Sequence, residues 1–310
     1  IADEAHRCAG KPDSAYSTVL DNDQIPANKR LFMTATPRTY TSQFKKKTAD
    51  SGVTMISMDN KQILGPELHK LTFVEAIKKA LLSYYQFVVI EVVNPNYSSM
   101  ITKRTLVETE TDIQSDAQSF ASHIGLAKAI KKYDLKRVIS FHSRVSAARD
   151  FAHKLPEIID WMPSEARPDG ELLTNYVSGA MPTDERNRNL KALGNITDEQ
   201  RYILSNARCL SEGVDVPAID AVLFADPKKS KIDIVQAAGR ALRKCDGKKF
   251  GYIIVPVVLD EDADNPSDDA FKQIITVISA LGMSDERIIE EFKAISNGER
   301  LGSKRIADLD

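Results

Sequence analysis

The sequence predicts an α/β fold built on parallel sheets. Short apolar runs rich in β-branched residues alternate with longer segments of helical spacing along most of the 310 residues. This alternation is typical of parallel strands that are linked by helices. Hydrophobic residues make up 42% of the chain and charged residues 28%. That composition is typical of soluble globular proteins, and the length is sufficient for two domains.

The first set of elements is short. Residues 31–36 (LFMTAT) and 52–57 (GVTMIS) are expected to form buried strands, the first of them ended by Pro37. Residues 73–85 carry apolar side chains at helical spacing and are expected to form a helix. The end of this set places a domain boundary near residues 83 to 95.

A longer set follows. Strands are expected at residues 86–93, 137–142, 173–179, 201–206, 221–226 and 251–259. Helices are expected at residues 116–133, at 146–155, in the arginine-rich stretch before residue 201, and at 229–244. Residues 261–269 form an acidic, breaker-rich linker, and two helical patterns at 270–281 and 284–295 come after it. Gly282 suits the end of the first of these helices and Ser284 the N-cap of the second.

Charge and cysteine content exclude several classes of protein. The formal net charge is -2, so any site for a polyanion must be a local patch. Cys8, Cys209 and Cys245 show no CxxC spacing. A disulfide framework or a zinc site is therefore not expected, and a reducing, cytoplasmic location fits. No apolar run approaches the length of a membrane span.

The first chemistry-bearing stretch is IADEAHR at residues 1–7. An apolar strand end followed by Asp-Glu fits a nucleotide hydrolase, in which Asp3 would hold Mg²⁺ through water and Glu4 would orient or deprotonate the attacking water. The alternative is an acidic helix start that complements the helix dipole. Thr34 and Thr36 follow at a predicted strand end, where their hydroxyls could bond to the acidic site or only cap the strand.

The stretch QAAGRALR, from Gln236 to Arg243, combines polar and small residues at helical spacing. Gln236, Gly239, Arg240 and Arg243 are expected on one helix face. Two guanidinium groups there could grip phosphate oxygens. A solvated basic face is the alternative, but it does not explain the Gln and the Gly.

The stretch SEGVDVP is less specific. Gly213 permits a tight turn, and Asp215 is either a turn former or a partner for a ribose or an arginine.

Taken together, these motifs resemble those of superfamily 2 helicases. DEAH, TAT, ISFHSR, NARCLSEGVDVP and QAAGRALR occur in the order of motifs II to VI, from Asp3 to Arg243. The chain looks most similar to the bacterial restriction-enzyme-like group. The resemblance implies RecA-like parallel sheets flanked by helices. Residues 1–85 would be the remnant of the first, ATP-binding lobe, 86–260 a complete second lobe, and 261–310 a helical accessory tail.

The resemblance also implies roles for single residues. Asp3 and Glu4 resemble the Mg²⁺ and water-activating pair, and His6 the link to motif VI. The residues that couple the lobes or approach ATP would be Thr34, Thr36, Gly213, Asp215, Gln236, Arg240 and Arg243. Those that meet the nucleic-acid backbone would be Ser143, Arg144, Ser178 and Gly179. Many relatives have Thr where this chain has Ala207, so Ser205 or Asn206 is the candidate for that contact.

One motif is missing from the sequence. Neither Gly10-Lys11 nor Gly247-Lys248 has the spacing of a G-x-x-x-x-G-K-[ST] phosphate loop. The expectation is the C-terminal part of an ATP- and Mg²⁺-dependent helicase or translocase whose phosphate loop precedes Ile1. The 310 residues alone would then be inactive. The expected partners are nucleic acid, with DNA favoured, the missing N-terminal lobe, and subunits of a restriction system.

Two other classes of function stay open from the sequence. One is a non-catalytic module that binds nucleic acid or a protein partner, and the other is the motor subunit of a restriction enzyme. The lysine and arginine clusters, including Lys248 and Lys249, are expected to be solvated surface.

Overall fold

The computed structural model describes residues 1–52, 54–93, 110–207, 209–210, 219–226, 230–259, 268–296 and 307–309. The chain divides into two compact units, Ile1–Leu71 and Thr72–Asp310, and each is described by itself. The lobe boundaries near residues 85 and 260 are a separate matter and stay predictions. Within the described residues, no helix is both long and apolar enough to cross a membrane.

The second unit is built on a parallel sheet with the strand order β3-β4-β2-β5-β6-β1-β7. Every neighbouring pair is parallel, which confirms the predicted fold class. The central strands are buried on both faces, which explains why their sequences are continuous apolar runs. The strands are Tyr84–Val93 (β1), Arg137–His142 (β2), Glu171–Ser178 (β3), Gln200–Ala207 (β4), Ala221–Phe224 (β5), Phe250–Leu259 (β6) and Ala307–Leu309 (β7).

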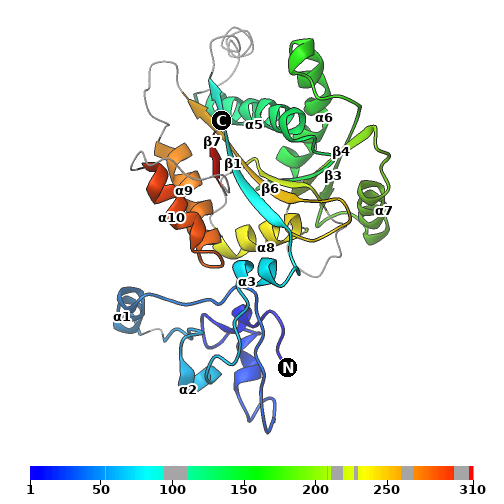
Figure 1. Ribbon diagram of the computed structural model, residues 1–310. Helices are drawn as coiled ribbons and strands as arrows, with labels where there is room; N and C mark the ends of the chain where they lie inside the picture. The colour runs from blue at the N-terminus through cyan, green and yellow to red at the C-terminus, as the bar shows by residue number, and fades with distance from the viewer. Residues whose placement is uncertain are drawn as a thin grey trace. The chain divides into compact units, whose positions relative to one another are not determined.

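Helices cover both faces of this sheet (Figure 1). One core joins Phe87, Phe141 and Phe224 to side chains of α7, α8, α9 and α10, and the other joins Val88, Val138 and Ile254 to side chains of α5 and α6. The helices are Phe73–Lys78 (α3), Glu110–Tyr133 (α5), Val145–Trp161 (α6), Thr183–Gly194 (α7), Lys231–Ala241 (α8), Asp268–Gly282 (α9) and Arg287–Ser296 (α10), with a 3-10 turn at Ser164–Ala166.

Helices α9 and α10 are fastened to the sheet by a buried polar cluster. The Tyr85 hydroxyl donates to Asp285 Oδ2 over 3.0 Å, and the Arg287 guanidinium donates to both Asp285 oxygens over 2.8 and 2.6 Å. Asp285 is only 1% exposed. Burial, followed by the Asp285 charge, raises the pKa of Tyr85, so its hydroxyl keeps the proton that it donates.

The turn between α9 and α10 corrects one detail. Gly282 does end α9, but a Cβ at this position would lie 2.4 Å from Ile289 Cδ1. Its missing side chain therefore lets the two helices approach. Ser284 is not the N-cap of α10, because that helix begins at Arg287. The Ser284 carbonyl instead accepts a hydrogen bond from the Phe73 amide over 2.9 Å.

The first unit corrects the predicted strands. Residues 31–36 and 52–57 do not form strands, since the described residues show only isolated bridges there, Ala2↔Phe32 and Gly10↔Ile56. Strand formation requires a partner over several residues, however apolar the pattern. The regular elements described in this unit are Ala5–Cys8 and Ser17–Leu20, both 3-10, with α1 (Ser42–Asp50) and α2 (Lys61–Leu64).

The helix expected at residues 73–85 is more than twice as long as the helix in the structure, α3, which has only 6 residues. Helix α3 ends at Lys78, and Ala80 adopts a left-handed backbone with φ of 59°. That conformation ends a helix and is costly for a residue with a side chain. The chain then passes Leu82, which bridges to Arg243, and enters β1 at Tyr84.

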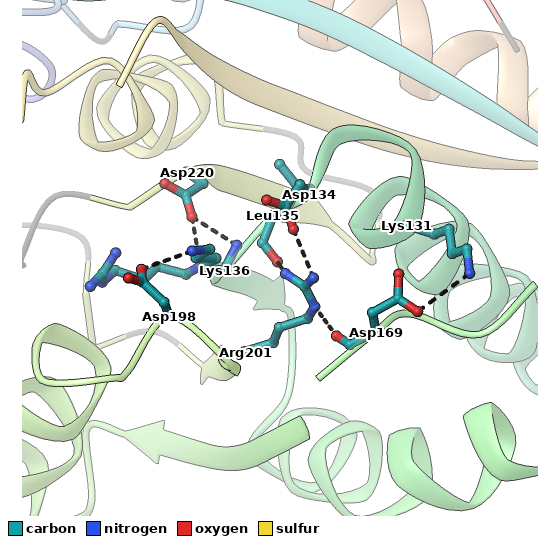
Figure 2. Close-up of polar contacts among 9 residues, drawn as sticks. Lys131, Asp134, Leu135, Lys136, Asp169, Asp198, Arg201 and Asp220 are labelled. Atoms are coloured by element: carbon teal, nitrogen blue, oxygen red, sulfur yellow. Dashed lines mark hydrogen bonds and ion pairs between the residues drawn. The ribbon is translucent and has the colours of Figure 1, made fainter. Parts of the chain in front are cut away.

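Figure 2 shows a polar cluster at the amino ends of β2, β4 and β5. Arg201, 8% exposed, donates to Asp134 Oδ1 over 2.7 Å, to the Leu135 carbonyl over 3.2 Å and to the Asp169 carbonyl. Asp220 Oδ2 accepts from the Lys136 and Arg137 amides over 2.8 Å each. These contacts fix the end of α5 and the starts of three strands relative to one another.

The buried histidine of α5 makes the stability of the second unit dependent on pH. His123 stacks on Phe151 with ring centroids 4.0 Å apart, and its ring nitrogens lie 2.6 and 3.1 Å from the Ser119 and Phe151 carbonyls. Burial lowers the pKa of His123 to about 4. An unfolded histidine titrates at about 6.5, so between these values the unfolded state binds more protons. The stabilisation is therefore complete above about pH 6.5 and is lost towards pH 4, by about 3 kcal/mol.

Urea unfolding followed by the fluorescence of Trp161, the single tryptophan, measures this dependence. His123→Asn should flatten the fall in unfolding free energy between pH 6.5 and pH 4. His153→Asn, which changes an exposed histidine of the same unit, should keep the wild-type slope. An equal slope in wild type and His123→Asn would contradict the assignment.

Candidate functional site

In the first unit the DEAH segment lies beside the TAT segment. The Ala2 amide donates to the Leu31 carbonyl over 2.8 Å, and the Ala2 carbonyl accepts from the Met33 amide over 2.9 Å. The Ala5 amide donates to the Met33 carbonyl over 2.9 Å. These bonds align residues 1–5 in parallel with residues 31–33, although the pairing is too short for a strand.

The side chains of the two segments meet at His6. Its Nδ1 lies 3.1 Å from Thr34 Oγ1 and 3.3 Å from Glu4 Oε2, and the ring is 7% exposed. Thr34 Oγ1 also accepts from the Thr36 amide over 3.1 Å. The structure therefore brings Glu4, His6, Thr34 and Thr36 together, and Thr34 links the two segments.

Two features of this cluster suit a site that binds a ligand. Glu4 has a left-handed backbone with φ of 49°, a strained conformation that is concentrated at functional sites. Thr36 is 3% exposed, and its Oγ1 has no hydrogen-bond partner among the described residues. A buried hydroxyl without a partner is costly, so a partner from outside these residues would stabilise it.

The DEAH segment offers few carboxylates for Mg²⁺ binding. Among the described residues, no group of three or more His, Cys, Asp or Glu side chains is arranged to hold a metal ion. Asp3 is exposed and accepts one bond, from the Glu4 amide over 2.9 Å. Mg²⁺ in nucleotide sites commonly uses one or two carboxylates, with phosphates and waters as the other ligands. A single exposed aspartate fits that mode.

In the second unit the predicted nucleic-acid residues gather at the carboxyl edge of the sheet. His142, Ala207 and Ser178 are paired across β2, β4 and β3, so Ser143 and Gly179 follow neighbouring strands at one edge. Gly179, Ser143 and Arg144 are exposed, whereas Ser178 is 2% exposed.

Asp226 shapes the turn at Ser143. Its Oδ2 accepts from the Ser143 amide and hydroxyl over 2.7 Å each. The next residue, Arg144, is the N-cap of α6. Sequence reasoning did not assign this role to Asp226, although its position after an apolar strand was a usable signal.

Asn206 and Ser205 have inward roles instead. Asn206 is 2% exposed, and its Oδ1 accepts from the Cys209 amide, the Cys209 thiol and the Leu210 amide over 3.2, 3.0 and 3.1 Å. Ser205 is fully buried and bonds to Ser140 over 3.0 Å. Neither presents its side chain to a ligand, so we leave both out of the proposed nucleic-acid surface.

Helix α8 carries the other predicted motif and corrects its geometry. The helix ends at Ala241, so Arg243 does not share a helix face with Gln236 and Arg240. Arg243 lies beyond the helix, is exposed, and bridges to Leu82. Arg240 is 7% exposed, and a Cβ on Gly239 would meet no atom within 4 Å. Gly213 and Asp215 lie outside the described residues.

The family comparison agrees with this geometry. Residues 123–245 match the family described as "Helicase conserved C-terminal domain". The matched helicase C-terminal domain lies wholly within the second unit. Its range runs from His123 in α5 to Cys245 just after α8, and so includes the carboxyl-edge residues and Arg240. The resemblance to superfamily 2 helicases is confirmed.

Proteins similar to this chain are much longer than it is. "Probable helicase A859L" of African swine fever virus (isolate Pig/Kenya/KEN-50/1950) is 26% identical over 294 residues, which cover 94% of this chain and 29% of that protein. The type ISP restriction-modification enzyme LlaBIII, solved bound to DNA, is 27% identical with a TM-score of 0.75. The match covers 99% of this chain and 21% of that enzyme. LlaGI, another type ISP enzyme, shares the fold at 22% identity and a TM-score of 0.59.

Proposed function

We propose that this chain is the C-terminal helicase portion of an ATP-driven motor that moves along DNA. The observation that carries the proposal is that one chain contains a DEAH segment in contact with a TAT segment and, after it, a helicase C-terminal domain. Bound ATP and Mg²⁺ would supply the γ-phosphoryl group and the charge that neutralises its oxygens.

In the first unit, Asp3 would hold the metal ion and Glu4 would take up a proton from the attacking water. His6 would keep Glu4 in position through its contact at 3.3 Å, and Thr34 would in turn hold His6 through a contact at 3.1 Å. Thr36 would use its buried hydroxyl to sense a group that arrives from outside the unit.

In the second unit, Arg240 would stabilise charge on the γ-phosphate, as arginine fingers do. Arg243 and Gln236 would help to bind the nucleotide, and so would Gly213 and Asp215. The missing side chain of Gly239 would let a phosphate or a backbone approach the helix, because nothing in the described chain occupies that space.

DNA is favoured as the track because two structural relatives, LlaBIII and LlaGI, were solved with DNA or a DNA substrate mimic bound. Ser143, Arg144, Ser178 and Gly179 at the carboxyl edge would meet the phosphate backbone, with Ser178 contributing main-chain groups because its side chain is buried. The chain's similarity to LlaBIII favours the motor part of a restriction enzyme among DNA translocases.

The proposal is tested by ATP turnover of the full-length gene product and of the 310-residue chain. The full-length protein should hydrolyse ATP faster with DNA than with RNA, and Glu4→Gln should abolish turnover while ATP still binds. The 310 residues alone should show little turnover because they lack a phosphate loop. Strong turnover by the 310-residue chain would contradict the proposal that the site needs a phosphate loop from outside these residues. No turnover by the full-length protein would favour a non-catalytic binding module.

A further inference from the structure

The carboxyl end of α8 is held from several sides. The Leu242 carbonyl accepts from the Ser83 amide over 2.8 Å, and Leu82 bridges to Arg243. A Cβ at Gly251 would lie 2.1 Å from the Ala241 carbonyl oxygen, so only glycine lets the start of β6 approach this closely. Packing at the end of α8 therefore sets the positions of Arg240 in its last turn and of Arg243 just beyond it.

Lys248 makes three further contacts near this end of the helix. Its ammonium donates to the carbonyls of Ala241, Arg243 (3.1 Å) and Ile219. A charged lysine has three N–H donors, and here each has a carbonyl acceptor. The last carbonyls of a helix have no partner within it and carry the negative end of the helix dipole, so a cation satisfies both needs. Lys248 is thus half-buried, contrary to its expected place on a solvated surface.

The Ile219 contact reaches a second motif. Ile219 and Asp220 follow the GVDVP sequence of residues 213–217 and directly precede β5. Asp220 is itself fixed, because its carboxylate accepts from the Lys136 and Arg137 amides at the start of β2 (Figure 2). One lysine therefore connects the exit of the GVDVP segment with the end of the arginine-bearing helix.

We propose that Lys248 is a positioning residue that clamps the end of α8 to Ile219 just before β5, so that Arg240 and Arg243 are held in place for hydrolysis. Its link to hydrolysis rests on the proposed function. Burial, the largest influence, lowers the pKa of Lys248, while the nearby Asp220 charge raises it. The protein thus accepts a desolvation cost here, and three carbonyl acceptors offset it.

Hydrogen exchange on the 310-residue chain tests the clamp without any activity. Lys248→Met removes all three donors while keeping an unbranched side chain. The Leu242 and Arg243 amides close the last turn of α8, through bonds to Ala238 and Arg240. They should exchange roughly 10- to 100-fold faster in this variant, with β2 unchanged. Lys248→Arg keeps a charged donor and should exchange at an intermediate rate.

Lys249→Met is the matched control, because Lys249 is the exposed neighbour. In this control variant the Leu242 and Arg243 amides should exchange at the wild-type rates. The clamp is refuted if Lys248→Met leaves the α8 amides unchanged, or if exchange rises equally in α8 and β2.

ATP turnover of the full-length protein tests the coupling. Lys248→Met should lower kcat by roughly tenfold and raise KM by less, because Lys248 acts on Arg240, which stabilises the transition state, as well as on Arg243, which helps to bind the nucleotide. Lys248→Arg should recover part of kcat, and Lys249→Met should match wild type. A rise in KM without a fall in kcat, or an unchanged kcat despite faster exchange at α8, would overturn the positioning role. If wild type shows no turnover, the proposed function fails, and the exchange result still decides the clamp.

Discussion

Arg240→Ala in the full-length protein should lower ATP turnover by about 10³- to 10⁵-fold, the range typical of arginine fingers, while nucleotide affinity falls far less. Arg240 is suited to this role because it is 7% exposed on a helix whose end is firmly held. A guanidinium in such a water-poor place stabilises phosphate charge strongly and needs little reorganisation. Single-turnover hydrolysis and equilibrium binding of a non-hydrolysable ATP analogue separate the two effects.

Two variants make this result specific. Arg240→Lys keeps the charge without the planar, forked donors and should recover only a small part of the rate. Arg149→Ala changes an exposed arginine of α6 that pairs with its neighbour Asp150 at 3.4 Å, and it should behave as wild type. Equal losses of binding and hydrolysis in Arg240→Ala would count against the finger role.

Arg287→Met should destabilise the second unit by about 3 kcal/mol. Asp285 is 1% exposed and would lose both guanidinium bonds, keeping the Tyr85 hydroxyl and the backbone amide of residue 287 as partners. We expect the lower end of the usual range for a broken buried pair, because the Arg287 side chain is 42% exposed. Urea unfolding followed by Trp161 fluorescence measures the change.

A second substitution identifies the cause. Asp285→Asn in the Arg287→Met background removes the uncompensated charge and should recover a large part of the loss. If the double variant is as unstable as the sum of the two single variants, the cost arises from lost packing and not from the stranded carboxylate.

Among the strands described in the second unit, β7 was not predicted, because Ala307–Leu309 lies in the segment that was expected to be a helical tail. The other strands were predicted closely, and burial on both faces makes the central ones continuous apolar runs. Residues 137–142 were expected as a strand, and β2 occupies the same six positions. The same reasoning failed for residues 31–36, whose apolar pattern is just as clear. Leu31 and Met33 are 40% and 43% exposed, since the described residues offer Phe32 only one bridging partner.

The contacts of the site could be predicted where they are local or where they join two recognisable motifs. A contact of Thr34 with the DEAH segment was expected, although through the acidic residues. The structure instead places Thr34 Oγ1 3.1 Å from His6 Nδ1. Lys248 has no such signature, and Asp226 has only its place after an apolar strand, because their partners Ile219 and Ser143 are distant in sequence. Similarly, the early end of α8 depends on Leu82 and Gly251, which no helical periodicity can reveal.

The place of β1 in the sheet has a consequence for synthesis on the ribosome. This strand ends at Val93, but both of its partners come much later in the chain, β6 at Phe250–Leu259 and β7 at Ala307–Leu309. At ordinary rates of elongation β1 waits on the order of ten seconds for its first partner. Until then the unpaired backbone groups along its two edges and its apolar side chains are open to other nascent strands, so chaperone binding at β1 would protect the chain from aggregation during that interval.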